Sequence, residues 1–303
     1  MKGLGREILR ERRRRLRERP LLHLVPHLFT ILGLGAGMTG MRYAFDDRWE
    51  LAVALVGLAA VFDGLDGRSA RILRIESKLG AQLDSLADFM SFGVAPAVIV
   101  YLWSLHDVRG VGWALAMLFA TCCALRLARF NVELEEPEVP RWRLWFFQGI
   151  PAPAAAGLAL LPLVAWLATG AGWLRSWPLN AAMALFVAVM MVSRVPTFSI
   201  KRVRVPPDYV VPVLVGAMLV VVFLVTEPWA TLTLLGLAYL ASLPASVVAA
   251  RRMREREAVA RRLARTAPEG TTAAASAAPT SPAPHDDGGG ARVVRLERGR
   301  GGE

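Results

Sequence analysis

Cysteine, histidine and tyrosine are scarce in this chain of 303 residues, which contains two, four and four of them. The two cysteines, Cys122 and Cys123, are adjacent within an apolar run. Adjacent cysteines in such a run provide neither a disulfide framework nor the spacing of a metal site, so we expect both to be packing residues. Charged residues are also few, at 20%, compared with about 25% in ordinary soluble domains.

Charge and hydrophobicity are segregated along the chain. The hydrophobic share is 54% and the mean hydropathy is +0.40, although Lys and Arg outnumber Asp and Glu by 36 to 25. Residues 1–19 hold nine Lys or Arg against three Glu, and residues 251–265 hold seven Arg against two Glu. Basic runs that flank apolar segments are typical of cytoplasmic membrane anchors. The sequence therefore predicts an integral membrane protein with no nucleic-acid partner.

Eight apolar segments are long enough to form membrane-spanning helices, which need about 20 residues each. Their hydrophobicity is continuous and lacks the alternation of a barrel strand, so we predict an all-α transmembrane bundle of about eight spans. Basic residues are concentrated in alternate loops, which places both termini in the cytoplasm. The predicted spans are 24–44, 50–72, 80–105, 111–130, 151–170, 178–198, 209–226 and 229–249.

The composition divides the chain into three parts. Residues 1–21 form a basic cytoplasmic arm, and residues 22–250 form the transmembrane domain. Residues 251–303 are first basic and then rich in Ala, Pro, Gly, Ser and Thr. A segment of that composition cannot assemble a core, so we expect a disordered cytoplasmic tail.

Four aspartates occupy the second and third predicted spans, where an ionised group costs roughly 2.5–3.5 kcal/mol on insertion. Asp63 and Asp66 share one helix face, and Asp84 and Asp88 share another, because residues three or four apart are neighbours on a helix. Facing carboxylates repel unless cations neutralise them, and hard divalent metals prefer oxygen ligands. The pattern predicts a site for Mg²⁺ or Mn²⁺ able to assist phosphoryl displacement. Residues suited to a phosphate-bearing ligand lie nearby: Gly67, Arg71, Lys78 and Gly80.

The pattern D-x-x-D-G-x-x-A-R-x8-G-x-x-x-D-x-x-x-D resembles the signature of the CDP-alcohol phosphatidyltransferases. Other stretches are similar to the phosphatidylserine synthase branch of that family, and the similarity extends over about residues 22–250. One departure is Pro26-His27, where members usually carry Pro-Asn. The signature is matched by Asp63, Asp66, Gly67, Ala70, Arg71, Gly80, Asp84 and Asp88, and the other stretches are Leu83–Phe89, Ser91–Ala97, Ala124–Asn131, Gly149–Pro153 and Val192–Phe198.

The resemblance implies transfer of a phosphatidyl group from CDP-diacylglycerol to the hydroxyl of L-serine, with release of CMP. It implies two divalent ions, Mg²⁺ or Mn²⁺, a homodimer, and a multi-pass protein of the cell membrane whose active site faces the cytoplasm. Asp88 would be both a metal ligand and the general base. The other metal ligands would be Asp63, Asp66 and Asp84, and the CDP-diacylglycerol contacts would include Gly67, Ala70, Arg71, Ser77 and Gly80.

Further polar residues lie at the predicted cytoplasmic ends of the spans. Arg126, Arg129 and Arg194 are candidates for holding the serine carboxylate or a lipid phosphate, since a guanidinium binds both anions well. Arg129 and Asn131 are also candidate contacts of the bound substrate. The alternative for each arginine is snorkelling to the membrane interface. Gly33, Gly37 and Gly40 are expected to allow close helix packing.

Three alternative functions fit part of the pattern. A sister enzyme with the same motif would use glycerol 3-phosphate, inositol or choline as the acceptor. A transporter or channel would use the carboxylates as an ion path, but the unusual polar residues gather at one membrane face. A scaffold without catalysis is disfavoured because every metal position keeps its aspartate.

Overall fold

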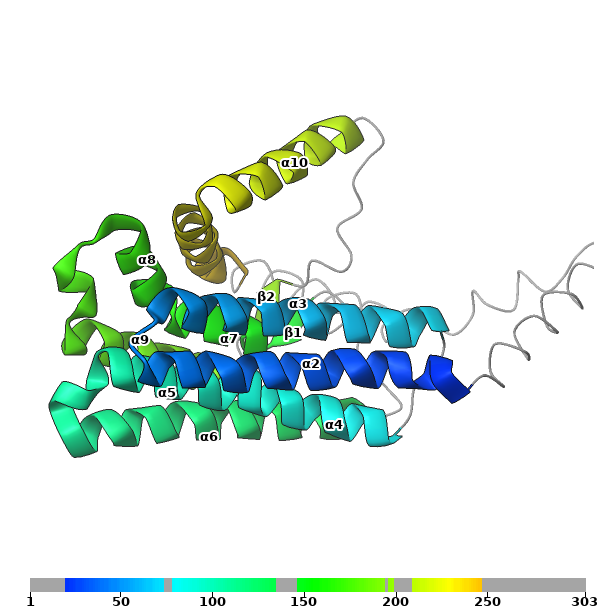
Figure 1. The fold of residues 1–303 in the computed structure, drawn as a ribbon, viewed down its shortest axis with the longest axis horizontal. Coiled ribbons are helices and arrows are strands. Elements are labelled where there is room, and N and C mark those ends of the chain that lie inside the picture. The colour runs from blue at the N-terminus through cyan, green and yellow to red at the C-terminus, as the bar shows by residue number, and fades with distance from the viewer. Residues whose placement is uncertain (1–19, 74–77, 135–145, 194–195, 199–208, 247–303) are drawn as a thin grey trace, which may run out of the picture. The chain divides into compact units, whose positions relative to one another are not determined.

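The computed structural model describes residues 20–73, 78–134, 146–193, 196–198 and 209–246, and these residues are helical apart from short turns and one pair of short strands (Figure 1). The all-α prediction is confirmed, with the strand pair as an addition. The tail predicted at 251–303, and all but the last residues of the arm predicted at 1–21, lie outside the described residues.

The first two helices form an antiparallel hairpin. Helix α2 (Pro20–Phe45) packs along α3 (Trp49–Leu73). The turn between them is tight, because Asp47 adopts a positive φ of 57° and the Arg48 amide donates to the Tyr43 carbonyl at 2.9 Å. The Arg48 guanidinium lies 5.1 Å from the centre of the Tyr43 ring, which adds a cation–π contact. The hairpin lets α3 lie beside α2 along most of its length (Figure 1).

The third predicted span contains an irregular turn next to its aspartates. It runs from α4 (Lys78–Asp88) through a π-helical stretch, Phe89–Val94, into α5 (Ala95–Trp103). The stretch begins directly after Asp88, and π-helical turns are frequent at functional sites. Helix α6 (Arg109–Leu134) follows and packs against α5 and the π-helical stretch.

The fifth predicted span is bent. Helices α7 (Ala152–Ala159) and α8 (Leu161–Thr169) meet at an angle of 46°. Pro162 explains the bend, because it has no amide hydrogen and its ring clashes with the carbonyl four residues earlier, that of Leu158. The sequence predicted a span at 151–170, and the structure adds a bend within it.

The sixth span ends earlier than its predicted limit at residue 198. Helix α9 (Trp177–Val192) stops before Pro196, and strand β2 (Pro196–Phe198) pairs antiparallel with β1 (Phe146–Gln148). In this register Gln148 lies opposite Pro196. Helix α10 (Val210–Thr226) and a last helix, Pro228–Ser246, complete the described chain.

Each of the eight predicted spans overlaps a helical segment, but fewer of these segments have the length and hydropathy expected of a membrane span. Among the described residues, three helices do so, at Leu79–Trp103, Leu105–Val132 and Pro228–Ser246, and the bent pair α7–α8 gives a fourth if it is one span. Helices α9 and α10 are apolar but shorter. The structure therefore supports a membrane protein, while the number of eight remains a prediction.

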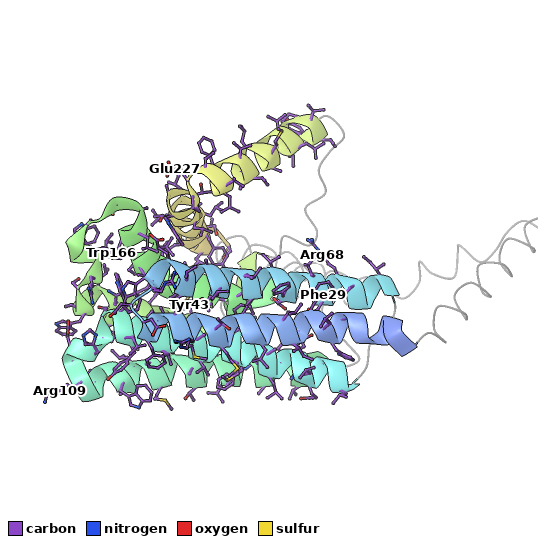
Figure 2. The ribbon with its side chains drawn as sticks, in the orientation of Figure 1. Phe29, Tyr43, Arg68, Arg109, Trp166 and Glu227 are labelled. Atoms are coloured by element: carbon purple, nitrogen blue, oxygen red, sulfur yellow. The ribbon has the colours of Figure 1, made fainter. Side chains whose placement is uncertain are left out.

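The buried core joins helices from α2 to α9. Its largest fully buried side chains include Trp103, Phe92 and Phe119. Cys123 is buried in the same core, and neither cysteine forms a disulfide, which agrees with the packing role predicted for both. Figure 2 shows Phe29 and Arg68 towards one end of α2 and α3, and Arg109 at the opposite end of the helices. The aspartates of α3 therefore lie towards the end opposite Arg109.

Gly37 lies where α2 meets the π-helical stretch, and a side chain there is expected to destabilise the fold. A Cβ atom at Gly37 would come 2.6 Å from Ser91 Oγ and 2.8 Å from Ser91 Cα, whereas one at Gly35 has nothing within 4 Å. We expect Gly37→Ala to cost about 1–3 kcal/mol of stability by overpacking. Gly35→Ala should be as stable as the parent protein or slightly more stable, because alanine has a higher helix propensity than glycine. Thermal unfolding in detergent compares the two, and equal melting temperatures would contradict this packing.

Candidate active site

Helices α3 and α4 bring three of the four predicted metal ligands together. One carboxylate oxygen from each of Asp63, Asp66 and Asp84 lies within 4.8 Å of the other two. Asp66 is 6% exposed, and the other two are half-buried. Ionised carboxylates this close repel one another strongly unless a cation lies between them. The i, i+3 spacing on α3 and the position of α4 beside α2 account for the cluster.

Asp66 is fixed by two hydrogen bonds. The Thr30 hydroxyl on α2 lies 2.9 Å from Asp66 Oδ2, with the Pro26 carbonyl as a second acceptor at 3.1 Å. The Gly67 backbone amide also hydrogen-bonds to the Asp66 carboxylate. Thr30 is a site residue that the sequence analysis missed. The sequence pointed to it only through a hydroxyl side chain one helical turn after Pro26 in a largely apolar span.

Asp84 supplies the clearest indication that the cluster suits a metal. Its Oδ1 atom is buried and has no hydrogen-bond partner among the described residues. A buried acceptor without a partner costs free energy that a bound cation would recover. Carboxylate oxygens are the ligands that Mg²⁺ and Mn²⁺ prefer. The residues present therefore fit a divalent metal.

Asp88 lies one turn beyond Asp84, at the end of α4, and is outside the three-carboxylate group. Its carboxylate still interacts electrostatically with Asp63, Asp66 and Asp84, and also with Arg126 of α6. Asp88 therefore interacts electrostatically with both the cluster and a cation. This position suits a role different from that of the other three.

Two predicted ligand contacts hold neighbouring helices together. Arg129 Nη1 on α6 donates to the Val192 carbonyl at the end of α9, at 2.8 Å. The Asn131 amide donates to Ser85 Oγ at 3.0 Å, and Ser85 lies between Asp84 and Asp88 on α4. These bonds give both residues a packing role, and their role as ligand contacts stays a prediction.

The remaining predicted contacts lie on or beside α3 and α4. Gly67 directly follows Asp66, and Gly80 lies one turn before Asp84. Ala70 and Arg71 belong to the last turns of α3, and the structure does not describe their side chains. Ser77 and Arg194 are outside the described residues. Binding by these residues stays a prediction.

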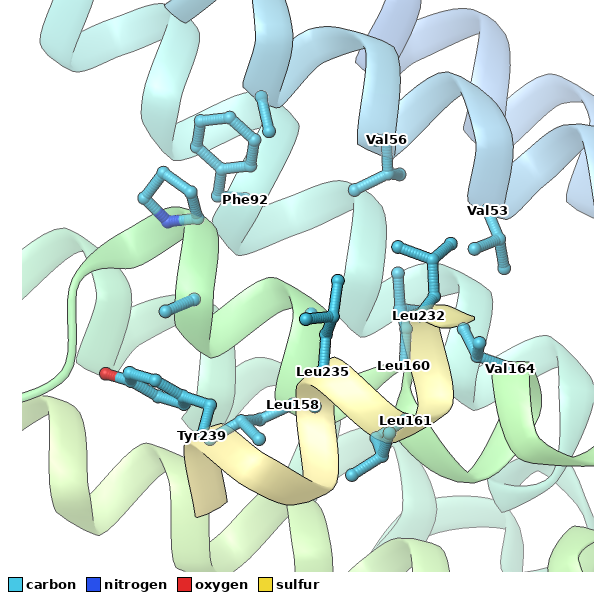
Figure 3. A pocket seen from close by; sticks show the side chains of 16 residues that line it. Val53, Val56, Phe92, Leu158, Leu160, Leu161, Val164, Leu232, Leu235 and Tyr239 are labelled. Carbon is cyan, nitrogen blue, oxygen red and sulfur yellow. The ribbon is translucent and has the colours of Figure 1, made fainter. Parts of the chain in front are cut away.

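An apolar pocket of about 290 Å³ lies between α3, α7, α8 and the helix Pro228–Ser246 (Figure 3). Its walls include Val53, Phe92, Leu158 and Leu235. Tyr239 also lines it, with the ring beside the other side chains and the hydroxyl pointing away from Leu235 and Leu161. The apolar lining of the pocket matches the polarity of a hydrocarbon chain.

Comparison with protein families identifies a known domain in this region. The family model of the CDP-alcohol phosphatidyltransferases matches residues 23–192. A second model, CDP-alcohol phosphatidyltransferase 2, matches residues 208–244. The first match contains all four aspartates and the helices that carry them.

Several curated relatives share the name CDP-diacylglycerol–serine O-phosphatidyltransferase. The protein of Mycobacterium leprae is 37% identical over 226 residues, which cover 75% of each chain. The protein of Mycobacterium tuberculosis is 35% identical over 75% of this chain and 79% of its own length. A Helicobacter pylori protein is 41% identical over 46% of this chain and 57% of its own.

Proposed function

Because the chain belongs to the CDP-alcohol phosphatidyltransferase family, we propose that it transfers a phosphatidyl group from CDP-diacylglycerol to the hydroxyl of L-serine and releases CMP. The observation that carries this proposal is the group formed by Asp63, Asp66 and Asp84 with Asp88 beside it. The names of the relatives and the branch-specific stretches of the sequence support serine as the acceptor.

In this proposal Asp63, Asp66, Asp84 and Asp88 hold two divalent ions, Mg²⁺ or Mn²⁺. Ions bound there would withdraw negative charge from the diphosphate and make CMP a better leaving group. Thr30 contributes by orienting the Asp66 carboxylate through its hydrogen bond.

Asp88 is the proposed general base. The serine hydroxyl is a weak nucleophile, so its proton must be removed as the oxygen attacks the β-phosphorus. Asp88 accepts that proton while the new O–P bond forms and the bond from phosphorus to the CMP oxygen breaks. The transfer is direct, and no side chain of the protein is phosphatidylated on the way.

The donor headgroup lies over α3 and α4 in this proposal, and its acyl chains remain in the membrane. The apolar pocket between α3, α7, α8 and the helix Pro228–Ser246 is suited in size and polarity to part of an acyl chain. The residues proposed to contact the headgroup are Gly67, Ala70, Arg71, Ser77 and Gly80, with Arg129 and Asn131 at the edge of the site.

We propose a multi-pass protein of the cell membrane with eight spans within residues 22–250, surrounded by membrane lipids and assembled as a homodimer. The basic arm at 1–21 and the tail at 251–303 lie in the cytoplasm, where serine and the cytidine headgroup are available. The alternation of basic loops supports this orientation. The aspartates then face the cytoplasm, at the end of the bundle opposite Arg109.

Acceptor competition tests the reaction. The full-length protein in detergent is given CDP-diacylglycerol and Mn²⁺ or Mg²⁺, and CMP release is measured with L-serine, glycerol 3-phosphate, inositol or choline. We expect release that depends on serine and on the metal. Release with only another alcohol would keep the phosphatidyltransferase and reject serine. No release with any acceptor, from protein shown to be folded, would reject the reaction.

A further inference from the structure

Two buried donor groups have no part in the chemistry described so far. Arg126 Nε on α6 and the Tyr239 hydroxyl on the helix Pro228–Ser246 are both buried, and neither has a hydrogen-bond partner in the described part of the chain. The two side chains interact electrostatically with each other although they are far apart in sequence. A buried donor left without a partner costs about 1–3 kcal/mol. Such a pair is therefore suited to an anionic ligand that would satisfy both donors.

The position of Arg126 separates it from the metal cluster. The titratable groups that act on its guanidinium are Cys123, Asp88 and Tyr239. The Asp84 carboxylate, in contrast, interacts electrostatically with Asp66 and Asp63. Of the four aspartates, Arg126 thus interacts electrostatically with Asp88, the proposed general base, which lies outside the three-carboxylate group. No ion pair with a described residue occupies the guanidinium.

Tyr239 lies at the border between apolar and charged surroundings. Its ring forms part of the wall of the apolar pocket, and its hydroxyl points out of that wall (Figure 3). The hydroxyl interacts electrostatically with Arg126. A phenol in this position can donate a hydrogen bond to a ligand held by the guanidinium, while its ring stays in the apolar wall.

We propose that Arg126 and Tyr239 bind the carboxylate of the acceptor serine and thereby direct its hydroxyl to Asp88. This inference rests on the function proposed above. A guanidinium pairs with a carboxylate through two parallel hydrogen bonds, and the phenol supplies a third. Serine carries its carboxylate and its hydroxyl with two carbon atoms between them, so a cation next to the base holds the nucleophile close to the base. Arg126 and Tyr239 are then the residues that determine acceptor specificity.

The other arginine candidate described on α6 is less suited to this role. Arg129 already donates to the Val192 carbonyl and so ties α6 to α9. Arg126 has no such bond among the described residues, and it is the cation that acts on Asp88. Of the two arginine candidates that the structure describes, Arg126 is therefore the better suited.

Kinetics of the full-length protein with two variants test the proposal. Tyr239→Phe keeps the ring in the pocket wall and removes only the hydroxyl, and Arg126→Lys keeps the charge but loses the two-pronged geometry. We expect the KM for serine to rise about 10- to 100-fold in each, as for a lost hydrogen bond to a charged group. The KM for CDP-diacylglycerol and the binding of Mn²⁺ should change less than about twofold, within the scatter of surface substitutions. Tyr209→Phe, at an exposed tyrosine, is the matched control and should behave like the parent.

Serinol, which has a hydroxymethyl group in place of the serine carboxylate, gives a second measurement. The parent protein should prefer serine to serinol strongly, and each variant should lose most of that preference. An unchanged KM for serine in both folded variants, or an equal rise in the KM for CDP-diacylglycerol, would overturn the inference while leaving the proposed function intact. Failure of the parent protein to use serine at all would overturn both.

Discussion

Asp88→Asn is expected to lower kcat by about 10²- to 10⁴-fold, the usual contribution of a general base. Asparagine has nearly the same shape as aspartate, so the end of α4 and the π-helical stretch after it should be unchanged. The amide cannot accept a proton from the serine hydroxyl, and the loss should therefore appear in kcat more than in the KM for CDP-diacylglycerol. CMP release at saturating Mn²⁺ separates this effect from weakened metal binding.

The matched control for Asp88→Asn is Asp107→Asn, which makes the same chemical change at an exposed aspartate. That variant should retain the parent kcat. A kcat for Asp88→Asn within tenfold of the parent value, at saturating metal, would contradict the assignment of Asp88 as the base. The metal ligands would then have to be examined for another proton acceptor.

Asp84→Asn is expected to remove metal-dependent activity and, in the absence of metal, to stabilise the protein. A bound divalent ion contributes several kcal/mol to a phosphoryl transfer, so the activity should fall roughly 10³-fold. Removing one of three clustered carboxylates also removes like-charge repulsion, which is unrelieved when no cation is bound. The melting temperature in EDTA should therefore equal or exceed that of the parent protein.

Direct measurement of Mn²⁺ binding completes this test. Electron paramagnetic resonance counts the bound Mn²⁺ ions, and Asp84→Asn should bind fewer than the parent protein. Added Mn²⁺ should raise the melting temperature of the parent more than that of the variant, because a ligand stabilises only the state that binds it. Equal Mn²⁺ binding by both proteins would show that Asp84 is not a ligand.

The carboxylate cluster could be predicted from the sequence because helical spacing fixes which residues share a face. Asp63 with Asp66, and Asp84 with Asp88, have that spacing. Burying their negative charges costs free energy, so the sequence predicted a cation that neutralises them. Helical spacing alone did not distinguish the four, and only the family resemblance singled out Asp88 as the base. The structure groups the other three and shows an electrostatic interaction of Asp88 with Arg126. That difference depends on where α6 lies, and periodicity along α4 does not specify a neighbouring helix.

Contacts between distant helices account for most of what the sequence analysis missed. Thr30 and Asp66 are 36 positions apart, and Tyr239 interacts electrostatically with Arg126 from a helix more than 100 positions away. Thr30 and Tyr239 each lie in a largely apolar segment, where one hydroxyl group gives little indication of a functional site. The bend before Pro162 had a visible cause, but a proline in a membrane helix is often tolerated, so it did not predict the angle.

The measurement that tests the central claim most directly is the lipid product itself. Purified protein with CDP-diacylglycerol, isotope-labelled L-serine and Mn²⁺ or Mg²⁺ is extracted into organic solvent, and mass spectrometry quantifies labelled phosphatidylserine alongside CMP. We predict that the two products form in equal amounts, that both disappear in EDTA, and that both fall together in Asp88→Asn. CMP formed without labelled lipid, or labelled lipid formed equally well in EDTA, would contradict metal-assisted transfer to serine.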